Sequence, residues 1–256
     1  DVITIGSATR DVFLAVDEAK NLIVPDFTTG QGQCFPLGSK IEVKKLVTVS
    51  GGGATNTAVT FARQGYNVAC VSVVGEDNDG KAIKDELLAE KVDIDFMSTH
   101  SDDRTGYSVI LVNPNGERTI LSYKGEGQHF EGGEFPFDKM EAKWFYLASV
   151  GGNFDILMKL VQVAEKTGAR VAMNPGTKDL QLGFEKLKPV MNKADIFIVN
   201  QEEASVLSGI DYKNEKDIFK FMDEAINGIF VMTKGPEGVV VSDGKNIYRA
   251  GIPDSP

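Results

Sequence analysis

The sequence predicts a doubly wound α/β fold, in which a mostly parallel sheet is covered by helices on both faces. After about residue 50, short runs rich in Val and Ile alternate with segments of helical periodicity. These strand runs are continuously apolar, which indicates strands buried on both faces. The 256 residues can bury a sizeable core, and a hydrophobic share of 42% is ordinary for a globular protein.

The predicted strands are short apolar, β-branched or aromatic runs bounded by polar residues or glycine. They cover residues 1–5, 66–74, 143–148, 170–173, 195–199, 229–233, 239–242 and 246–249. The predicted helices have an apolar side and lie between these runs. They run from the glycines near residue 52 to 64, and over 81–92, 154–167, 184–191, 202–207 and 215–226. Gly65 and Gly168 follow two of the helices, where glycine commonly ends a helix.

Two segments, residues 12–49 and 105–123, interrupt the alternation. The second predicts a hairpin, because two β-rich runs flank an Asn-Pro-Asn-Gly turn at 113–116. Together the segments predict a small β-sheet that projects from the core; the alternative is a decorated edge of the main sheet. The sequence contains neither internal repeats nor a linker, so we expect one domain over residues 1–256.

The charge balance excludes some partners. With 27 basic and 37 acidic residues the net charge is −10, which disfavours binding to nucleic acid or to anionic membranes. The longest apolar runs, such as 68–74, are much shorter than the ~20 residues of a membrane span. Cys34 and Cys70 form neither a C-x-x-C pair nor a disulfide framework, so we expect a cytoplasmic protein.

A glycine-rich segment, Ser50 to Ala58, joins a predicted strand to a helix. Gly52 and Gly53, with the preceding glycine, allow a tight turn and let a ligand approach the first amides of the helix. Asn56, in the first helical turn, could direct its amide at that ligand. A tight turn without a ligand is the alternative. A dinucleotide-binding G-x-G-x-x-G is disfavoured, because Asn56 occupies the third glycine position and the first strand-to-helix turn lacks the motif.

Several polar residues follow predicted strands, at the edge where open α/β sheets bind ligands. Asp11 lies shortly after the first strand and Asn174 after a later one. Asn200 and Glu203 begin a helix three residues apart, a pair suited either to a hydrated Mg²⁺ or to a capping box. Asp77 or Asn78, in contrast, is expected only to cap a helix.

The turn after the strand 229–233 is a further candidate. Thr233 with Gly235 and Gly238 could hold the phosphates of a nucleotide, although an ordinary turn between strands has the same composition. The order of all these motifs is more informative than any one of them. Gly-Ser-x-x-x-Asp, Gly-Gly-x-x-x-Asn, Gly-x-Asp-x-x-Gly, Asn-Pro, Asn-x-x-Glu and Thr-x-Gly-x-x-Gly follow one another along the chain.

In this order the motifs resemble those of the ribokinase (PfkB) family of sugar and nucleoside kinases. The resemblance implies a Rossmann-like core with a protruding β-sheet lid, and transfer of the γ-phosphoryl group of ATP to a primary hydroxyl of a sugar. It also implies an acceptor site, formed by Asp11, Gly52, Gly53 and Asn56. Asn174, Asn200, Thr233, Gly235 and Gly238 would bind the nucleotide, and Glu203 would organise Mg²⁺. A monovalent cation is left open.

The family's second signature, Asp-Thr-x-Gly-Ala-Gly-Asp, carries the anion-hole glycines and the catalytic base, and residues 1–256 do not contain it. We therefore expect the base beyond Pro256, and no turnover by residues 1–256 alone. Two alternatives remain. One is a nucleoside kinase, with Phe13, Phe27 or Phe35 lining the pocket for the nucleobase of the substrate. The other is a non-catalytic relative that binds a sugar or a nucleotide. Because the strands of a lid expose edges, we also expect a homodimer through the lids.

Overall fold

The structure is a computed structural model that describes residues 1–16, 20–25, 31–114, 117–128, 130 and 135–252. A nine-stranded sheet forms its centre, in the order β15–β14–β13–β12–β11–β10–β1–β6–β7. The strands are β1 (Val2–Ile5), β6 (Val68–Gly75), β7 (Met97–His100), β10 (Trp144–Leu147), β11 (Arg170–Met173), β12 (Ile196–Asn200), β13 (Ile229–Thr233), β14 (Val239–Ser242) and β15 (Ile247–Ala250). All neighbours pair in parallel except β13–β14 and β14–β15.

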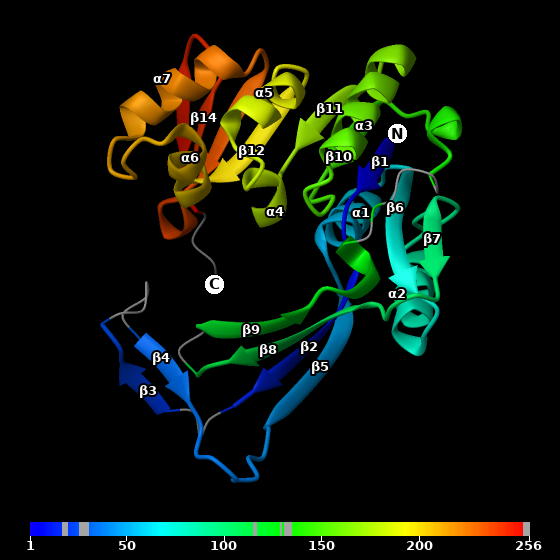
Figure 1. The fold of residues 1–256 in the computed structure, drawn as a ribbon, viewed down its shortest axis with the longest axis vertical. Helices are drawn as coiled ribbons and strands as arrows, with labels where there is room; N and C mark the ends of the chain where they lie inside the picture. The colour runs from blue at the N-terminus through cyan, green and yellow to red at the C-terminus, as the bar shows by residue number, and fades with distance from the viewer. Residues whose placement is uncertain (17–19, 26–30, 115–116, 129, 131–134, 253–256) are drawn as a thin grey trace.

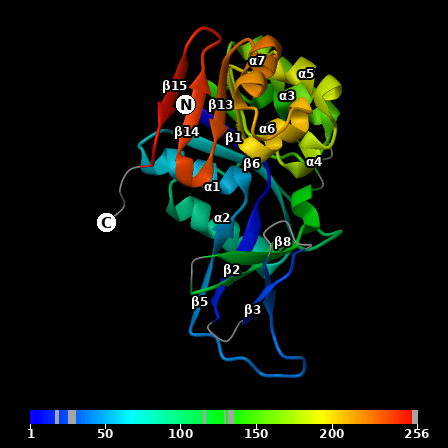
Figure 2. The same cartoon turned by 90° about the vertical axis from the view of Figure 1, so that its left-hand side faces the viewer.

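Helices cover both faces of this sheet, as the apolar strand runs predict. On one face α1 (Gly53–Arg63) and α2 (Asn78–Ala89) pack on Val68, Cys70 and Val74. On the other face α3 (Phe154–Thr167), α5 (Phe184–Met191), α6 (Gln201–Ser208) and α7 (Glu215–Ala225) enclose the larger core. Figure 2 shows this second group of helices gathered on one side of β13, β14 and β15. Among the described residues, no helix combines the length and hydrophobicity needed to cross a membrane.

Most predicted elements are found within one to three residues of their expected bounds. The helix expected over 81–92 begins earlier, at Asn78, because the Asp77 side chain caps it and accepts a hydrogen bond from the amide of Gly80 at 2.8 Å. β7 and the one-turn helix α4 (Thr177–Leu180) were not predicted. The sequence of β7, Met-Ser-Thr-His, carries a single apolar residue and therefore no strand pattern.

The interrupting segments form a separate four-stranded sheet, the lid, which projects from the main body (Figure 1). Its order is β5–β2–β8–β9, with β2 (Thr9–Ala15), β5 (Lys45–Gly51), β8 (Gly106–Val112) and β9 (Arg118–Tyr123). The lid therefore begins at Thr9, before the expected residue 12. Within the range 12–49, β2 and β5 belong to the lid, whereas β3 (Lys20–Ile23) and β4 (Gln31–Cys34) pair with each other in a separate two-stranded sheet.

The lid has two chemically different faces. Asp11 is paired with Val49 on β5 and Ser108 on β8, so these three side chains share one face. Leu14 is paired with Leu46 and Leu111, and this row lies on the opposite face, because residues an odd number apart on a strand point to opposite sides. The lid thus carries its carboxylate on one side and a row of leucines on the other.

Ion pairs and caps fix the lid to the core. Arg10 on β2 forms an ion pair with Glu86 on α2, and Glu86 also accepts the amide of Ser50 at 2.7 Å. Burial alone would raise the pKa of Glu86, but these hydrogen bonds outweigh burial and the pKa is lowered. Asp77 accepts the amide and the hydroxyl of Thr105, immediately before β8, at 2.9 and 2.7 Å. The core therefore holds β2, β5 and β8 at their attachment points.

Candidate functional site

The candidate site lies at the carboxyl edge of the parallel strands, around β1. The chain leaves β1 towards β6 on one side of it, while β10 pairs with β1 on the other side. Such a reversal of strand order is where open α/β sheets bind ligands. The lid begins here, since β2 follows β1 after three residues.

Asp11 sits on β2 with its carboxylate fixed. The hydroxyl of Thr9 donates to Oδ1 of Asp11 at 2.9 Å. Oδ2 lies above Gly51, where an added Cβ atom would be only 2.0 Å from it. Gly51 therefore makes the space that Asp11 occupies. Neither Thr9 nor Gly51 was among the predicted site residues, and only the pairing of β2 with β5 shows their role.

Gly52 and Gly53 are needed for the packing of the α1 start. Gly52 has φ 106° and ψ 159°, a conformation essentially restricted to glycine, and an added Cβ would lie 2.3 Å from the carbonyl oxygen of Ser7. An added Cβ on Gly53 would lie 2.6 Å from Cβ of Ala148, after β10. The amides of Gly53 and Ala54 donate to Ser7, so the structure uses these two amides internally.

Asn56 is exposed on α1 and reaches the edge of the lid. It lines a cavity of about 470 Å³ between α1, α2 and β5, together with Val49 and Ser50 of β5 and Glu86 of α2. Val49 shares a lid face with Asp11. The structure thus places Asp11 beside the turn that carries Gly52 and Gly53, at the junction of β1, β2, β5 and α1, and it places Asn56 in the first turn of α1.

The second group of predicted residues lies at the ends of β11, β12 and β13. The side-chain amide of Asn174 donates to the carbonyl oxygen of Ile198 at 2.9 Å. Asn200, the last residue of β12, is the direct neighbour of Thr233, the last residue of β13. Thr233 is exposed at this edge.

Asn200 and Glu203 form the capping box that the sequence left open as an alternative. Oδ1 of Asn200 accepts the amide of Glu203, and Oε2 of Glu203 accepts the amide of Asn200, both at 2.8 Å. Among the described residues no cluster of three or more His, Cys, Asp or Glu side chains could hold a metal ion alone. One carboxylate and one amide nevertheless fit a hydrated Mg²⁺, because this ion keeps several waters and takes most other ligands from phosphates.

The turn after β13 is sharply bent at both of its predicted glycines. Gly235 has φ 54° and Gly238 has φ 89°. An added Cβ on Gly238 would lie 2.1 Å from the carbonyl oxygen of Ala250, at the end of β15. The turn is therefore packed against β15, which the sequence could not show.

Asp179, which was not predicted, joins the loops after β10 and β11. It is fully buried and accepts the amides of Gly152, after β10, and Gly176, after β11, each at 2.8 Å. Burial raises the pKa of Asp179, and hydrogen bonds from Gly176 and Gly152 oppose this shift. The spacing Gly176-x-x-Asp179, at the start of a one-turn helix, was the only signal in the sequence.

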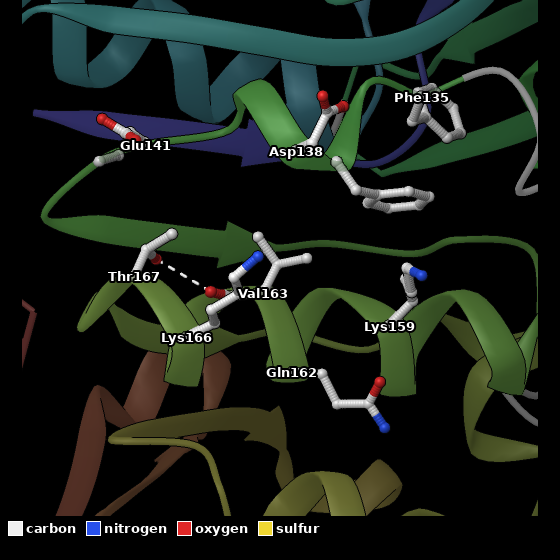
Figure 3. Close-up of a pocket in the computed structure, with 10 residues that line it drawn as sticks. Phe135, Asp138, Glu141, Lys159, Gln162, Val163, Lys166 and Thr167 are labelled. Carbon is white, nitrogen blue, oxygen red and sulfur yellow. Dashed lines mark hydrogen bonds between the residues drawn. The ribbon is translucent and has the colours of Figure 1, made fainter.

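A larger cavity lies elsewhere in the described part of the chain. It has a volume of about 890 Å³ and is lined by residues of α3, among them Lys159 and Lys166, and of the loop carrying Asp138 and Glu141 (Figure 3). Glu141 precedes β10 and Thr167 precedes β11, so this cavity is at the amino ends of the strands. It contains none of the predicted site residues, and we place the functional site at the carboxyl edge.

A mostly parallel sheet with polar residues at its carboxyl edge and a separate β-sheet lid defines a protein of ribokinase-like fold. The profile of the pfkB family of carbohydrate kinases matches residues 2–254, and the chain belongs to this family. It is 30% identical over 206 residues to a ribokinase from Haemophilus influenzae. This aligned region covers 75% of this chain and 63% of the ribokinase. A nucleoside kinase from Methanothermobacter thermautotrophicus is 24% identical over 254 residues, 99% of this chain and 75% of that protein.

Solved structures show the same fold. The structure of Arabidopsis thaliana ribokinase complexed with ribose and ATP matches with a TM-score of 0.75 and 20% identity, over 98% of this chain and 77% of that one. Adenosine kinase from Sinorhizobium meliloti matches with a TM-score of 0.78 and 23% identity, over 100% and 81%. At these identities the likeness concerns the fold. The predicted fold class and family are therefore confirmed.

Proposed function

We propose that the protein transfers the γ-phosphoryl group of ATP to a primary hydroxyl of a sugar. The observation that carries this proposal is the placement of two different groups along one sheet edge. Asp11 on β2 lies beside the turn that leads from β5 into α1 and Asn56, and Asn200 and Thr233 are paired at the ends of β12 and β13. A hydroxyl-binding carboxylate and a separate polar turn suit a reaction between a polyol and a nucleotide.

In this proposal Asp11 accepts hydrogen bonds from acceptor hydroxyls through the oxygen that Thr9 does not occupy. Asn56 contributes its side-chain amide, and Gly52 and Gly53 shape the floor. Thr233, Gly235 and Gly238 line the nucleotide site, with Asn174 close to the phosphates. Asn200 and Glu203 would hold Mg²⁺ through its waters, and the ion would neutralise charge on the transferring phosphoryl group. We further propose that the reaction takes place in the cytoplasm.

A nucleoside acceptor is the second candidate. Phe13 lies two residues after Asp11 on β2, so both side chains point to the same lid face, roughly 7 Å apart along the strand. An aromatic ring at that distance from a ribose-binding carboxylate could stack on a base. Phe27 lies outside the described residues, and Phe35 follows β4 on the separate hairpin.

The function is tested with the full-length protein, MgATP and a panel of pentoses, hexoses and nucleosides, with ADP release as the measurement. We expect at least one sugar to be phosphorylated at a primary hydroxyl, and acceptors whose primary hydroxyl is replaced by hydrogen to be inert. Preference for a nucleoside over every free sugar would favour the second candidate. Binding of sugar and ATP without ADP release would favour a non-catalytic relative and contradict the proposal.

We also propose a homodimer through the leucine face of the lid. Leu46 on β5 and Leu121 on β9 are 60% and 57% exposed, and register places both on the face opposite Asp11. Exposed apolar edge strands of this kind are commonly covered. Leu121→Lys should give a monomer by light scattering. Ile120→Lys is the matched control, because Ile120 is also exposed on β9 but points to the other face; a monomeric parent protein would contradict the proposal.

A further inference from the structure

Lys234 follows Thr233 in the turn proposed to bind the nucleotide, but its side chain points to acidic groups behind the turn. Its ammonium group donates to Oε2 of Glu215 at 2.9 Å and lies 2.9 Å from Oε2 of Glu237. Only 12% of the Lys234 side chain and 19% of the Glu215 side chain are exposed. This lysine is therefore neutralised and largely covered, unlike a lysine held ready for a phosphate.

Glu215 connects three elements of the fold. It is the first residue of α7, and its second carboxylate oxygen accepts a hydrogen bond from the guanidinium of Arg249 on β15. Arg249 precedes Ala250, whose carbonyl oxygen lies against Gly238 at the end of the same turn. One carboxylate thus joins the start of α7, the turn after β13 and the end of β15.

The two cations also keep this carboxylate charged. Hydrogen bonds from Arg249 and Lys234 lower the pKa of Glu215, and hydrogen bonds to Glu215 and Glu237 raise the pKa of Lys234. Within the turn, the amide of Lys234 donates to the carbonyl oxygen of Gly238 at 2.8 Å. The backbone of the turn is closed on itself at the residue whose side chain is anchored.

We propose that Lys234 and Glu215, with Arg249, are positioning residues for the nucleotide, which fix the turn of Thr233, Gly235 and Gly238 against α7 and β15. The inference rests on the proposed function, because it takes this turn as the nucleotide site. Neither Lys234 nor Glu215 contacts ATP in this proposal. A carboxylate would repel phosphates, so any dependence of ATP binding on Glu215 must act through the shape of the turn.

The test measures the Kd for MgATP, and KM for ATP and for the acceptor, in full-length Lys234→Met and Glu215→Gln variants. We expect each variant to weaken ATP binding about tenfold, the size of one lost charge-assisted hydrogen bond, with acceptor KM changed less than about twofold. The double variant should bind ATP with an affinity no lower than that of the single variant with the lower affinity, because both changes break the same contact. The matched control is Lys193→Met with Glu165→Gln, an ion pair between α3 and the segment after α5, which should leave both KM values unchanged.

Three outcomes would overturn the inference. A loss of ATP affinity in Lys234→Met but not in Glu215→Gln would show that Lys234 contacts the nucleotide itself. Unchanged ATP affinity in both variants of an active enzyme would exclude any positioning role. A parent protein that neither binds ATP nor releases ADP would remove the proposed function and the inference together. ATP binding that depends on Glu215, without phosphoryl transfer, would retain the inference alone.

If Lys234→Met fails to fold, Arg249→Gln replaces it. This variant should also weaken ATP binding about tenfold and change the acceptor KM less than about twofold. Lys234→Arg should restore the parental ATP affinity.

Discussion

Asp11→Asn should lower kcat/KM for the acceptor by roughly 10²-fold and leave the Kd for ATP unchanged. A hydrogen bond to a charged group contributes about 1.5–3 kcal/mol, which is a tenfold to hundredfold effect for each acceptor hydroxyl held by the carboxylate. The substitution keeps the size of the side chain, so Gly51 still accommodates it and the lid keeps its register. The measurement is steady-state kinetics with each substrate varied in turn.

Two variants separate the chemistry of Asp11 from its surroundings. Thr9→Val removes the hydrogen bond to Oδ1 of Asp11. It should lower kcat/KM for the acceptor by only about tenfold, because the carboxylate loses this support but is still present. Asp95→Asn, at an exposed aspartate on the loop before β7, should have no effect. An Asp11→Asn enzyme with parental acceptor kinetics would remove Asp11 from the site and leave the nucleotide half untouched.

The fold was largely predictable from the sequence, because the parallel strands are buried on both faces and read as apolar runs. The runs at 170–173, 229–233 and 239–242 became β11, β13 and β14 with the same bounds. β7 could not be predicted, since its strand identity comes from pairing with β6 rather than from its own residues. The separation of β3 and β4 from the lid is likewise a matter of tertiary pairing, which local composition does not encode.

The residues of the candidate site likewise fall into those that the sequence predicted and those that it did not. Asp11, Asn200 and Glu203 were predicted as site residues from the order of their motifs along the chain, since each motif alone has an ordinary structural alternative. Gly51 and Asp179 were missed because each acts on a segment distant in sequence: Gly51 makes room for Asp11, and Asp179 joins the loops after β10 and β11. Such roles depend on which strands pair, and local sequence patterns do not show that pairing.

The glycine motif has a role in the structure that differs from the one its sequence suggested. The sequence suggested that Gly52 and Gly53 free the first amides of α1 for a ligand. In the structure the amides of Gly53 and Ala54 donate to Ser7, and the glycines are required by close contacts with Ser7 and Ala148. The motif therefore assembles β1, β10 and α1 at the strand reversal, and the proposed acceptor site would depend on this assembly.

Gly52→Ala is accordingly expected to destabilise the whole fold. Its backbone conformation costs a non-glycine residue about 1–3 kcal/mol, and the added Cβ would in addition lie 2.3 Å from the carbonyl oxygen of Ser7. We expect a loss of about 3 kcal/mol or more in the free energy of unfolding, which corresponds to a fall in Tm of roughly 10 °C. Differential scanning calorimetry measures this change directly.

Gly183→Ala is the matched control, because it separates backbone strain from the steric contact. Gly183 has φ 81° and ψ 161°, nearly the conformation of Gly52, but an added Cβ there meets no atom within 4 Å. It should therefore show only the strain, about 1–3 kcal/mol, and retain parental acceptor KM. Equal losses of stability in the two variants would mean that Ser7 moves aside without cost. In that case the close approach of β1 to α1 would not be what holds the acceptor site together.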